Sequence, residues 1–95
     1  MADMNHKFEV HKMYADKLNE IYRAKNTDYD DSFAKGIDSM GYASAIVRME
    51  DKFNRIKSLL LKGTEAKVDE SVEDTLLDLA NYSLMLLTEY KTRKT

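Results

Sequence analysis

The chain has 95 residues, a formal net charge of −2 from 15 basic and 17 acidic side chains, and no cysteine. This length suits one hydrophobic core, so we expect a single domain over residues 1–95, and the balanced charge argues against direct nucleic-acid binding. The lack of cysteine excludes disulfides, thiolate zinc sites and cysteine nucleophiles. The lack of a signal-peptide region, or of an apolar run near ~20 residues, predicts a cytoplasmic protein with no membrane partner.

The sequence predicts an all-α protein, because it has no proline, only three glycines, and apolar residues at helical spacing. We expect three long helices, over about residues 3–25, 42–62 and 70–91, and a short helix over 32–40. The segment KNTDYDDSF, rich in Asn and Asp, favours a turn before the short helix, and GTEAKVDES reads as the loop before the last helix.

The first long helix carries one apolar arc that includes a histidine. We interpret His11 as a buried, hydrogen-bonded core residue in preference to a ligand contact. In the segment that follows, Lys25, Asn26 and Asp28 are placed either to contact a phosphate or sugar or simply to form a turn. Four tyrosines can stack on a nucleobase, although tyrosine at helical spacing is more often a core residue with a satisfied hydroxyl. They are Tyr14, Tyr22, Tyr29 and Tyr82. The arc comprises Met4, Phe8, His11, Tyr14, Ala15, Leu18, Ile21 and Tyr22.

The second long helix combines an apolar stripe with a charged side. Around Asp51, three cations suit phosphates, but the geometry favours ordinary ion pairing along the helix, because Asp51 lies roughly opposite the apolar stripe. Glu50 lies nearer the margin of the stripe, so spacing favours Glu50 over Asp51 as a metal ligand. The stripe comprises Ala45, Ile46, Met49, Phe53, Ile56 and Leu60, and the three cations are Arg48, Lys52 and Arg55.

The third long helix is apolar on nearly all sides, which is typical of a helix that is buried on nearly all sides. Three long helices and a short one cannot surround it, so we expect a homodimer or homotetramer whose joined chains complete a larger bundle. A thin polar strip remains. Carboxylates one turn apart on an apolar background suit Mg²⁺, and a solvated surface strip is the equally weighted alternative. The strip consists of Glu70, Asp74, Asp78 and Asn81.

The segments KNTDYDDSF, RMEDKFNR and ESVEDTLLDLANY, in this order, resemble the first nucleotide-modification-associated domain family, whose small members are common in phages and prophages. That family is similar to the MazG and dimeric dUTPase group of all-α nucleoside triphosphate pyrophosphohydrolases. The resemblance implies a MazG-like bundle, dimers or tetramers, Mg²⁺ (or Mn²⁺) held by acidic residues, and a nucleotide ligand. For a phage protein it also implies the host cytoplasm.

The resemblance carries over residue by residue. Asp74 matches the end of the second acidic motif, ExxD, whose glutamate is Ser71 here, and Asp78 belongs to the narrower family's pattern. The first motif, ExxE, is not intact, because Phe53 lies three residues after Glu50. Further matches are the DK pair Asp51 and Lys52, the flanking Arg48 and Arg55, and the KxxDY residues Lys25, Asp28 and Tyr29.

Three functions are therefore open. The first is Mg²⁺-dependent hydrolysis of a nucleoside triphosphate to monophosphate and pyrophosphate. In it Glu50 or Asp51, with Asp74 and Asp78, carry catalysis, and Glu70 helps to hold the metal. The second is a binding protein that sequesters a nucleotide, including a cyclic or ADP-ribose-type signal of a host. The third is an interaction protein whose acidic strip is merely surface. Residues expected at the nucleotide in the first two are Lys25, Asp28, Tyr29, Arg48, Lys52, Arg55, Asn81 and Tyr82.

Overall fold

The computed structural model describes residues 3–62 and 68–93, with side chains from residue 71 onward in the second range. Within these ranges every element is a helix, which confirms the predicted all-α class. The three long helices and the short one occur in the predicted order. They are α1 (Met4–Asp28), α2 (Ser32–Met40), α3 (Ala43–Lys62) and α4 (Val68–Thr92).

The first helix ends later than the sequence predicts. It begins at the cap residue Asp3, whose carboxylate accepts a 2.8 Å hydrogen bond from the amide of His6. It then continues past Lys25, because the Tyr29 amide still donates to the Lys25 carbonyl at 2.9 Å. The predicted turn is therefore compressed into three residues, 29–31.

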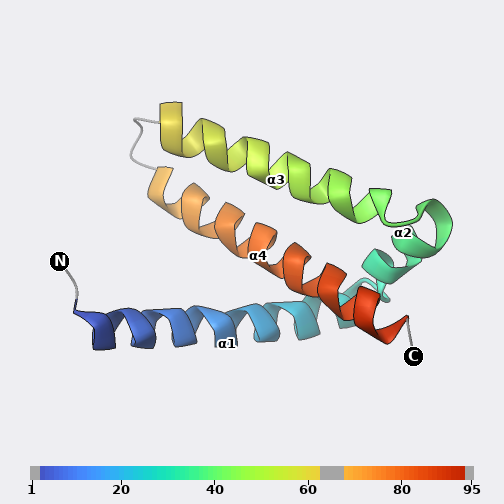
Figure 1. Cartoon of the computed structure of the whole chain (residues 1–95), viewed down its shortest axis with the longest axis horizontal. Coiled ribbons are helices and arrows are strands. Elements are labelled where there is room, and N and C mark those ends of the chain that lie inside the picture. The colour runs from blue at the N-terminus through green and yellow to red at the C-terminus, as the bar shows by residue number, and fades with distance from the viewer. Residues whose placement is uncertain (1–2, 63–67, 94–95) are drawn as a thin grey trace.

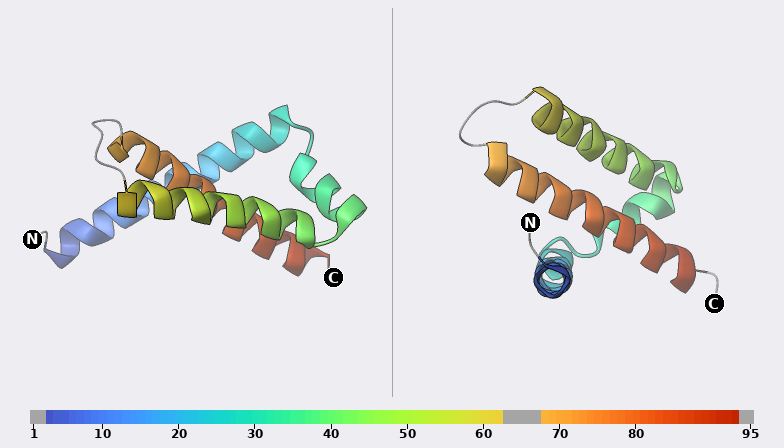
Figure 2. Two further views of the ribbon diagram at one scale, coloured as in Figure 1. Left: turned by 90° about the horizontal axis from the view of Figure 1, so that it is seen from above. Right: turned by 60° about the vertical axis from the view of Figure 1, so that its left-hand side comes forward.

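Helix α4 is the central element. Helices α3 and α4 lie side by side and antiparallel, α2 covers the end of this pair, and α1 crosses α4 on the side away from α3 (Figures 1 and 2). No helix in the described part of the chain is long and apolar enough to span a membrane.

The core is small and lies where α2 meets the α3–α4 pair. Phe33 and Ile37 of α2 pack with Ala45 of α3, and partly buried side chains of α4 complete the cluster. The side chain of Arg93 fastens the end of α4 to this region by hydrogen bonds to the Asp38 carboxylate and the Ala34 carbonyl, at 2.7 and 3.0 Å. This packing fixes α2 and α3 against α4 beside the cavity described below.

The single chain is far from compact. Its accessible surface is 7357 Å², roughly 1,700 Å² more than the about 5,600 Å² expected for a folded monomer of this mass. Its radius of gyration is 15.3 Å, against about 12 Å for a compact domain of this length. The predicted apolar faces are accordingly only partly buried. On α3, Ala45 and Ile56 are buried, whereas Ile46, Phe53 and Leu60 are exposed.

The interpretation of His11 as a buried core residue is wrong for the single chain. His11 is exposed, as are Met4 and Phe8 on the same arc, and the one buried side chain of α1 is Leu18. The physical reason is that α1 meets α4 at an angle, so the two helices diverge toward the start of α1 (Figure 1). Residue spacing identifies the apolar face of a helix, but it does not show over what length another helix covers that face.

Candidate functional site

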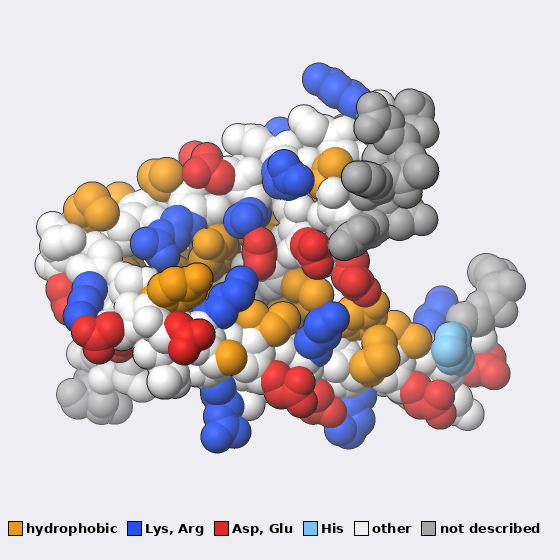
Figure 3. Space-filling model, turned by 180° about the vertical axis from the view of Figure 1, so that it is seen from behind, with side chains coloured by type: hydrophobic (Ala, Val, Ile, Leu, Met, Phe, Trp, Pro, Cys, Tyr) orange, Lys and Arg blue, Asp and Glu red, His pale blue; other side chains and the backbone are white. Residues whose placement is uncertain are grey.

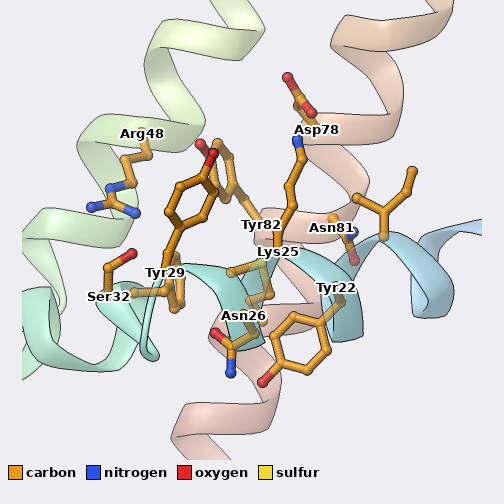
Figure 4. Close-up of a pocket in the computed structure, with 12 residues that line it drawn as sticks. Tyr22, Lys25, Asn26, Tyr29, Ser32, Arg48, Asp78, Asn81 and Tyr82 are labelled. Carbon is orange, nitrogen blue, oxygen red and sulfur yellow. The ribbon is translucent and has the colours of Figure 1, made fainter.

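A cavity of about 240 Å³ lies where the last turns of α1 and the start of α2 meet α3 and α4 (Figure 4). It combines aromatic rings, amides, two basic side chains and one carboxylate. Six of the predicted nucleotide or metal residues are brought together here although they come from three helices and a turn. They are Lys25, Tyr29, Arg48, Asp78, Asn81 and Tyr82, and the cavity is completed by Ile21, Tyr22, Asn26, Ser32, Phe33 and Met85.

The turn over residues 29–31 shapes one rim of the cavity. Asp30 and Asp31 both adopt left-handed backbone angles, with φ of 51° and 56°, which aspartate tolerates better than most residues. The Lys35 ammonium lies 2.5 Å from the Asp30 carboxylate, and its hydrogen bond lowers the pKa of Asp30. This tight turn presents Tyr29 and then Ser32 to the cavity within four residues.

Two stacked aromatic rings in the cavity lie beside an arginine that has no acidic partner among the described side chains. The rings of Phe33 and Tyr82 are nearly parallel, 10° apart, with centroids separated by 6.1 Å. The guanidinium of Arg48 lies over the Phe33 ring, 5.7 Å from its centroid. Arg48 is half-buried, yet it makes no hydrogen bond and no ion pair with any residue that the structure describes. A half-buried, unpaired guanidinium beside an open cavity is suited to binding an anion.

The carboxylate of the cavity is already paired. Asp78 lies 2.8 Å from the Lys52 ammonium, and the two side chains are only 36% and 29% exposed. Lys25 extends toward Asp78 as well, whereas Arg48 lies on the other side of the Tyr29 and Tyr82 rings (Figure 4). The single acidic group of this site therefore has cationic neighbours rather than other carboxylates.

Asn81 joins the cavity to α1. It is 7% exposed, and its amide nitrogen donates a 3.0 Å hydrogen bond to the carbonyl of Leu18. This bond fixes the orientation of the amide, because only the nitrogen can donate. Asn81 is thus held on the cavity wall by a contact between residues 63 positions apart.

Several predicted residues lie elsewhere. Glu50, Asp51, Asp74 and Asp28 are exposed and do not line the cavity, and the Glu70 side chain lies outside the described residues. Arg55 is held away from the cavity, because its Nε donates a 3.2 Å hydrogen bond to the buried hydroxyl of Thr75. Because both are exposed, the structure favours neither Glu50 nor Asp51 as a metal ligand.

The described side chains do not form a cluster of three His, Asp or Glu residues of the kind that holds a metal by itself. Mg²⁺, however, often takes only one or two protein carboxylates together with phosphate oxygens and water. Asp78 at the cavity, with Asp74 one helical turn before it, meets that smaller requirement. A Mg²⁺ site here stays a prediction.

The structure also adds residues that the sequence did not single out. Ser32 and Phe33 line the cavity because the compressed turn brings the start of α2 against α4. Tyr22, weighed as a stacking residue, lines it too, and partial burial raises the pKa of its hydroxyl. No spacing rule within one helix places these side chains, since their neighbours lie on another helix.

A second, larger hollow separates α1 from α4. It is an apolar groove of about 830 Å³, visible as a notch lined with hydrophobic side chains in the space-filling view (Figure 3). The Tyr14 hydroxyl donates to the Glu73 carboxylate across it, and this hydrogen bond raises the pKa of Tyr14. We call this surface the α1–α4 groove. It is lined by His11, Tyr14, Ala15, Leu18, Val72, Glu73, Leu76, Leu77, Ala80 and Leu84.

The model of one protein family matches residues 25–89, about two thirds of the chain. The family is described as nucleotide modification associated domain 1. The chain belongs to this family. The nucleotide modification associated domain 1 match spans every residue that lines the cavity except Ile21 and Tyr22, so the cavity lies within the family's domain. Comparison with curated proteins and with solved structures gives no significant match.

Proposed function

We propose that this protein binds a nucleotide in the cavity between α1, α2, α3 and α4. The observation that carries the proposal is the half-buried guanidinium of Arg48, which has no partner among the described side chains and lies beside the stacked rings of Phe33 and Tyr82. A guanidinium pairs with a phosphate through two parallel hydrogen bonds, and aromatic rings accept a base or a sugar face. Membership of a family named for nucleotide modification supports the same ligand class.

Binding without hydrolysis agrees best with the surroundings of Asp78. The pairing of Asp78 with Lys52 neutralises the one carboxylate in the cavity, and the other predicted acidic residues with described side chains point to solvent. The protein then acts by holding a nucleotide and withdrawing it from use, as a sequestering protein of phage or prophage type would. A cyclic or ADP-ribose-type signal belongs to the same ligand class.

Mg²⁺-dependent hydrolysis of a nucleoside triphosphate is the second candidate, and the position of Asp78 at the cavity supports it. Asp78, Asp74 and Glu70 would hold the ion, which when bound lowers the pKa of a water molecule and neutralises charge on phosphoryl oxygens. Lys52 would first have to release Asp78, and Arg48 and Lys25 would steady the phosphates. The resemblance to MazG-like enzymes is the source of this candidate.

Calorimetric titration with common nucleotides tests the proposal, using wild type and Arg48→Gln. We expect binding by the wild type and at least a tenfold loss in Arg48→Gln, because a charge-assisted pair contributes about 1.5–3 kcal/mol. Arg23→Gln is the matched control, since Arg23 is an exposed arginine on α1 that does not line the cavity. Nucleotide affinity equal in all three proteins would reject this site.

Metal removal separates the two candidates. A protein that only sequesters its ligand keeps its nucleotide affinity in EDTA and returns the ligand unaltered on chromatography. The enzyme loses affinity in EDTA and releases pyrophosphate when Mg²⁺ or Mn²⁺ is restored. If the protein is this enzyme, Asp74→Asn and Asp78→Asn should each abolish the release of pyrophosphate.

We also propose that the protein works as a homo-oligomer. The excess surface of roughly 1,700 Å² per chain lies in the range of roughly 1,000–2,500 Å² that each subunit of an obligate dimer buries. The α1–α4 groove supplies a continuous apolar surface for this contact. A chain that stays monomeric at micromolar concentration would favour the third function, an interaction protein that needs another partner.

A further inference from the structure

The cavity has an unusual distribution of charge for a nucleotide site. Its lining includes two cations, Lys25 and Arg48, and one anion, Asp78. Of the two cations, only Arg48 is half-buried, while Lys25 is exposed and extends toward Asp78 (Figure 4). One guanidinium is therefore available inside the cavity to a phosphate group, and it lies away from the acidic end.

The two cations do not form a continuous track. In Figure 4 the Tyr29 and Tyr82 side chains stand between Arg48 and Lys25, so the basic groups flank the aromatic part of the cavity on opposite sides. A triphosphate chain needs adjacent cations or a metal to neutralise successive phosphates. A single phosphate needs only one guanidinium and a few neutral donors. Ser32, beside Arg48 in the same view, can supply a hydroxyl donor.

The size of the cavity also favours a ligand with a single phosphate over one with a triphosphate chain. Its volume of about 240 Å³ lies below the about 300–1,000 Å³ of typical small-molecule sites. It can enclose a compact ligand, but two further phosphates would extend out of it.

We propose that the ligand carries a single phosphate per nucleoside, held by Arg48 without a divalent cation, with its base or sugar against the tyrosines. This inference rests on the proposed nucleotide binding and narrows it to monophosphates. The phosphate is a 5′-monoester or a cyclic diester, since both present oxygens that one guanidinium can bind. Asp78, neutralised by Lys52, then serves as a hydrogen-bond acceptor for the nucleoside instead of a metal ligand.

The test is a calorimetric series on the wild-type protein. Each common nucleoside is titrated as its 5′-monophosphate, its 3′,5′-cyclic monophosphate and its 5′-triphosphate, in EDTA and again in Mg²⁺. We expect one monophosphate to bind at least tenfold more tightly than the matching triphosphate, with equal affinity in both buffers. Tighter binding of the monoester or of the cyclic form identifies which phosphate chemistry the cavity takes.

Variants then assign the phosphate contact. Arg48→Gln should weaken the preferred monophosphate at least tenfold, and Arg48→Lys should restore only part of the loss, because an ammonium lacks the two-pronged geometry. Arg23→Gln should bind as wild type does. Circular dichroism checks that each variant retains its helices, and the wild-type ligand series decides the matter even if one does not fold.

Two outcomes overturn the inference and can be told apart. Tighter binding of a triphosphate, dependent on Mg²⁺, would refute the monophosphate assignment while leaving nucleotide binding itself in place. Failure of folded wild-type protein to bind any nucleotide in the series would refute both proposals together.

Discussion

The pairing of Lys52 with Asp78 decides whether the cavity has a free carboxylate, and a double-mutant cycle measures it. The cycle compares wild type, Lys52→Met, Asp78→Asn and the double variant. The two charged atoms are 2.8 Å apart, and the side chains are 29% and 36% exposed. Fully exposed pairs contribute about 0.2–1 kcal/mol, while breaking a buried pair costs about 3–5 kcal/mol. For this partly exposed pair we expect a coupling free energy of about 1 kcal/mol.

Urea denaturation followed by circular dichroism supplies the four unfolding free energies. With a slope of about 1–3 kcal/mol per molar urea, a coupling of this size corresponds to a midpoint change of roughly 0.3–1 M. Protein concentration must be the same throughout, because the proposed oligomerisation would make the stability depend on concentration. The pair Lys12 and Asp16 is the matched control. Its separation is also 2.8 Å, but its side chains are 78% and 64% exposed, so its coupling should stay below about 0.5 kcal/mol.

The reasoning fails if the Lys52–Asp78 coupling is no larger than that of the control pair. Asp78 would then be free for a metal, and hydrolysis would become the better candidate. A second readout sharpens this result. If Asp78 is a latent metal ligand that Lys52 blocks, Lys52→Met should bind Mg²⁺ more tightly than wild type, whereas a purely structural pair gives no such gain.

Three further predictions concern stability and assembly. Asn81→Ala should lower the free energy of unfolding by about 1–3 kcal/mol in thermal or urea denaturation, because it removes the buried link from α4 to α1; an unchanged midpoint would contradict that link. Leu76→Glu should dissociate the proposed oligomer in analytical ultracentrifugation, whereas Leu61→Glu, on a residue outside the α1–α4 groove, should not. The hydrogen bond to Glu73 raises the pKa of Tyr14 above 10.0, so the folded state favours the protonated phenol. The stabilisation of the folded state by this hydrogen bond is complete below about pH 10 and is lost as the pH rises through the raised pKa of Tyr14. The free energy of unfolding should therefore fall less for Tyr14→Phe than for wild type between about pH 8 and pH 11.

The helices could be predicted from the sequence because their signals are local. The short helix occurs at the predicted residues 32–40, and α3 and α4 begin and end within two residues of the prediction. The end of α1 was missed because Asn26 and Asp28, which favour turns, are helical here and the turn follows them. Two consecutive left-handed aspartates then complete the reversal, a conformation that no helical spacing indicates.

The sequence could indicate candidate residues for the site, but not which of them line the cavity. Spacing placed Asp78 and Asn81 on one strip, and both line the cavity. It could not show that Lys52 pairs with Asp78, or that Arg55 is held by Thr75, because these contacts join α3 to α4. Spacing favours Glu50 over Asp51 as a metal ligand, but both residues are exposed in the single chain, so this preference stays a prediction.

The arrangement of α4 explains why its sequence combines a polar strip with apolar residues on nearly every other side. At about 100° per residue, the cavity residues 78, 81, 82 and 85 and the groove residues 72, 76, 80 and 84 fall on roughly opposite faces of this helix. The strip lies on the cavity face. Its second half, Asp78 and Asn81, is enclosed where α1 and α2 approach, while Asp74 faces solvent because the cavity ends before it. The two proposals therefore assign one face of α4 to the ligand and the opposite face to a second chain, and we expect separate substitutions to abolish binding and assembly.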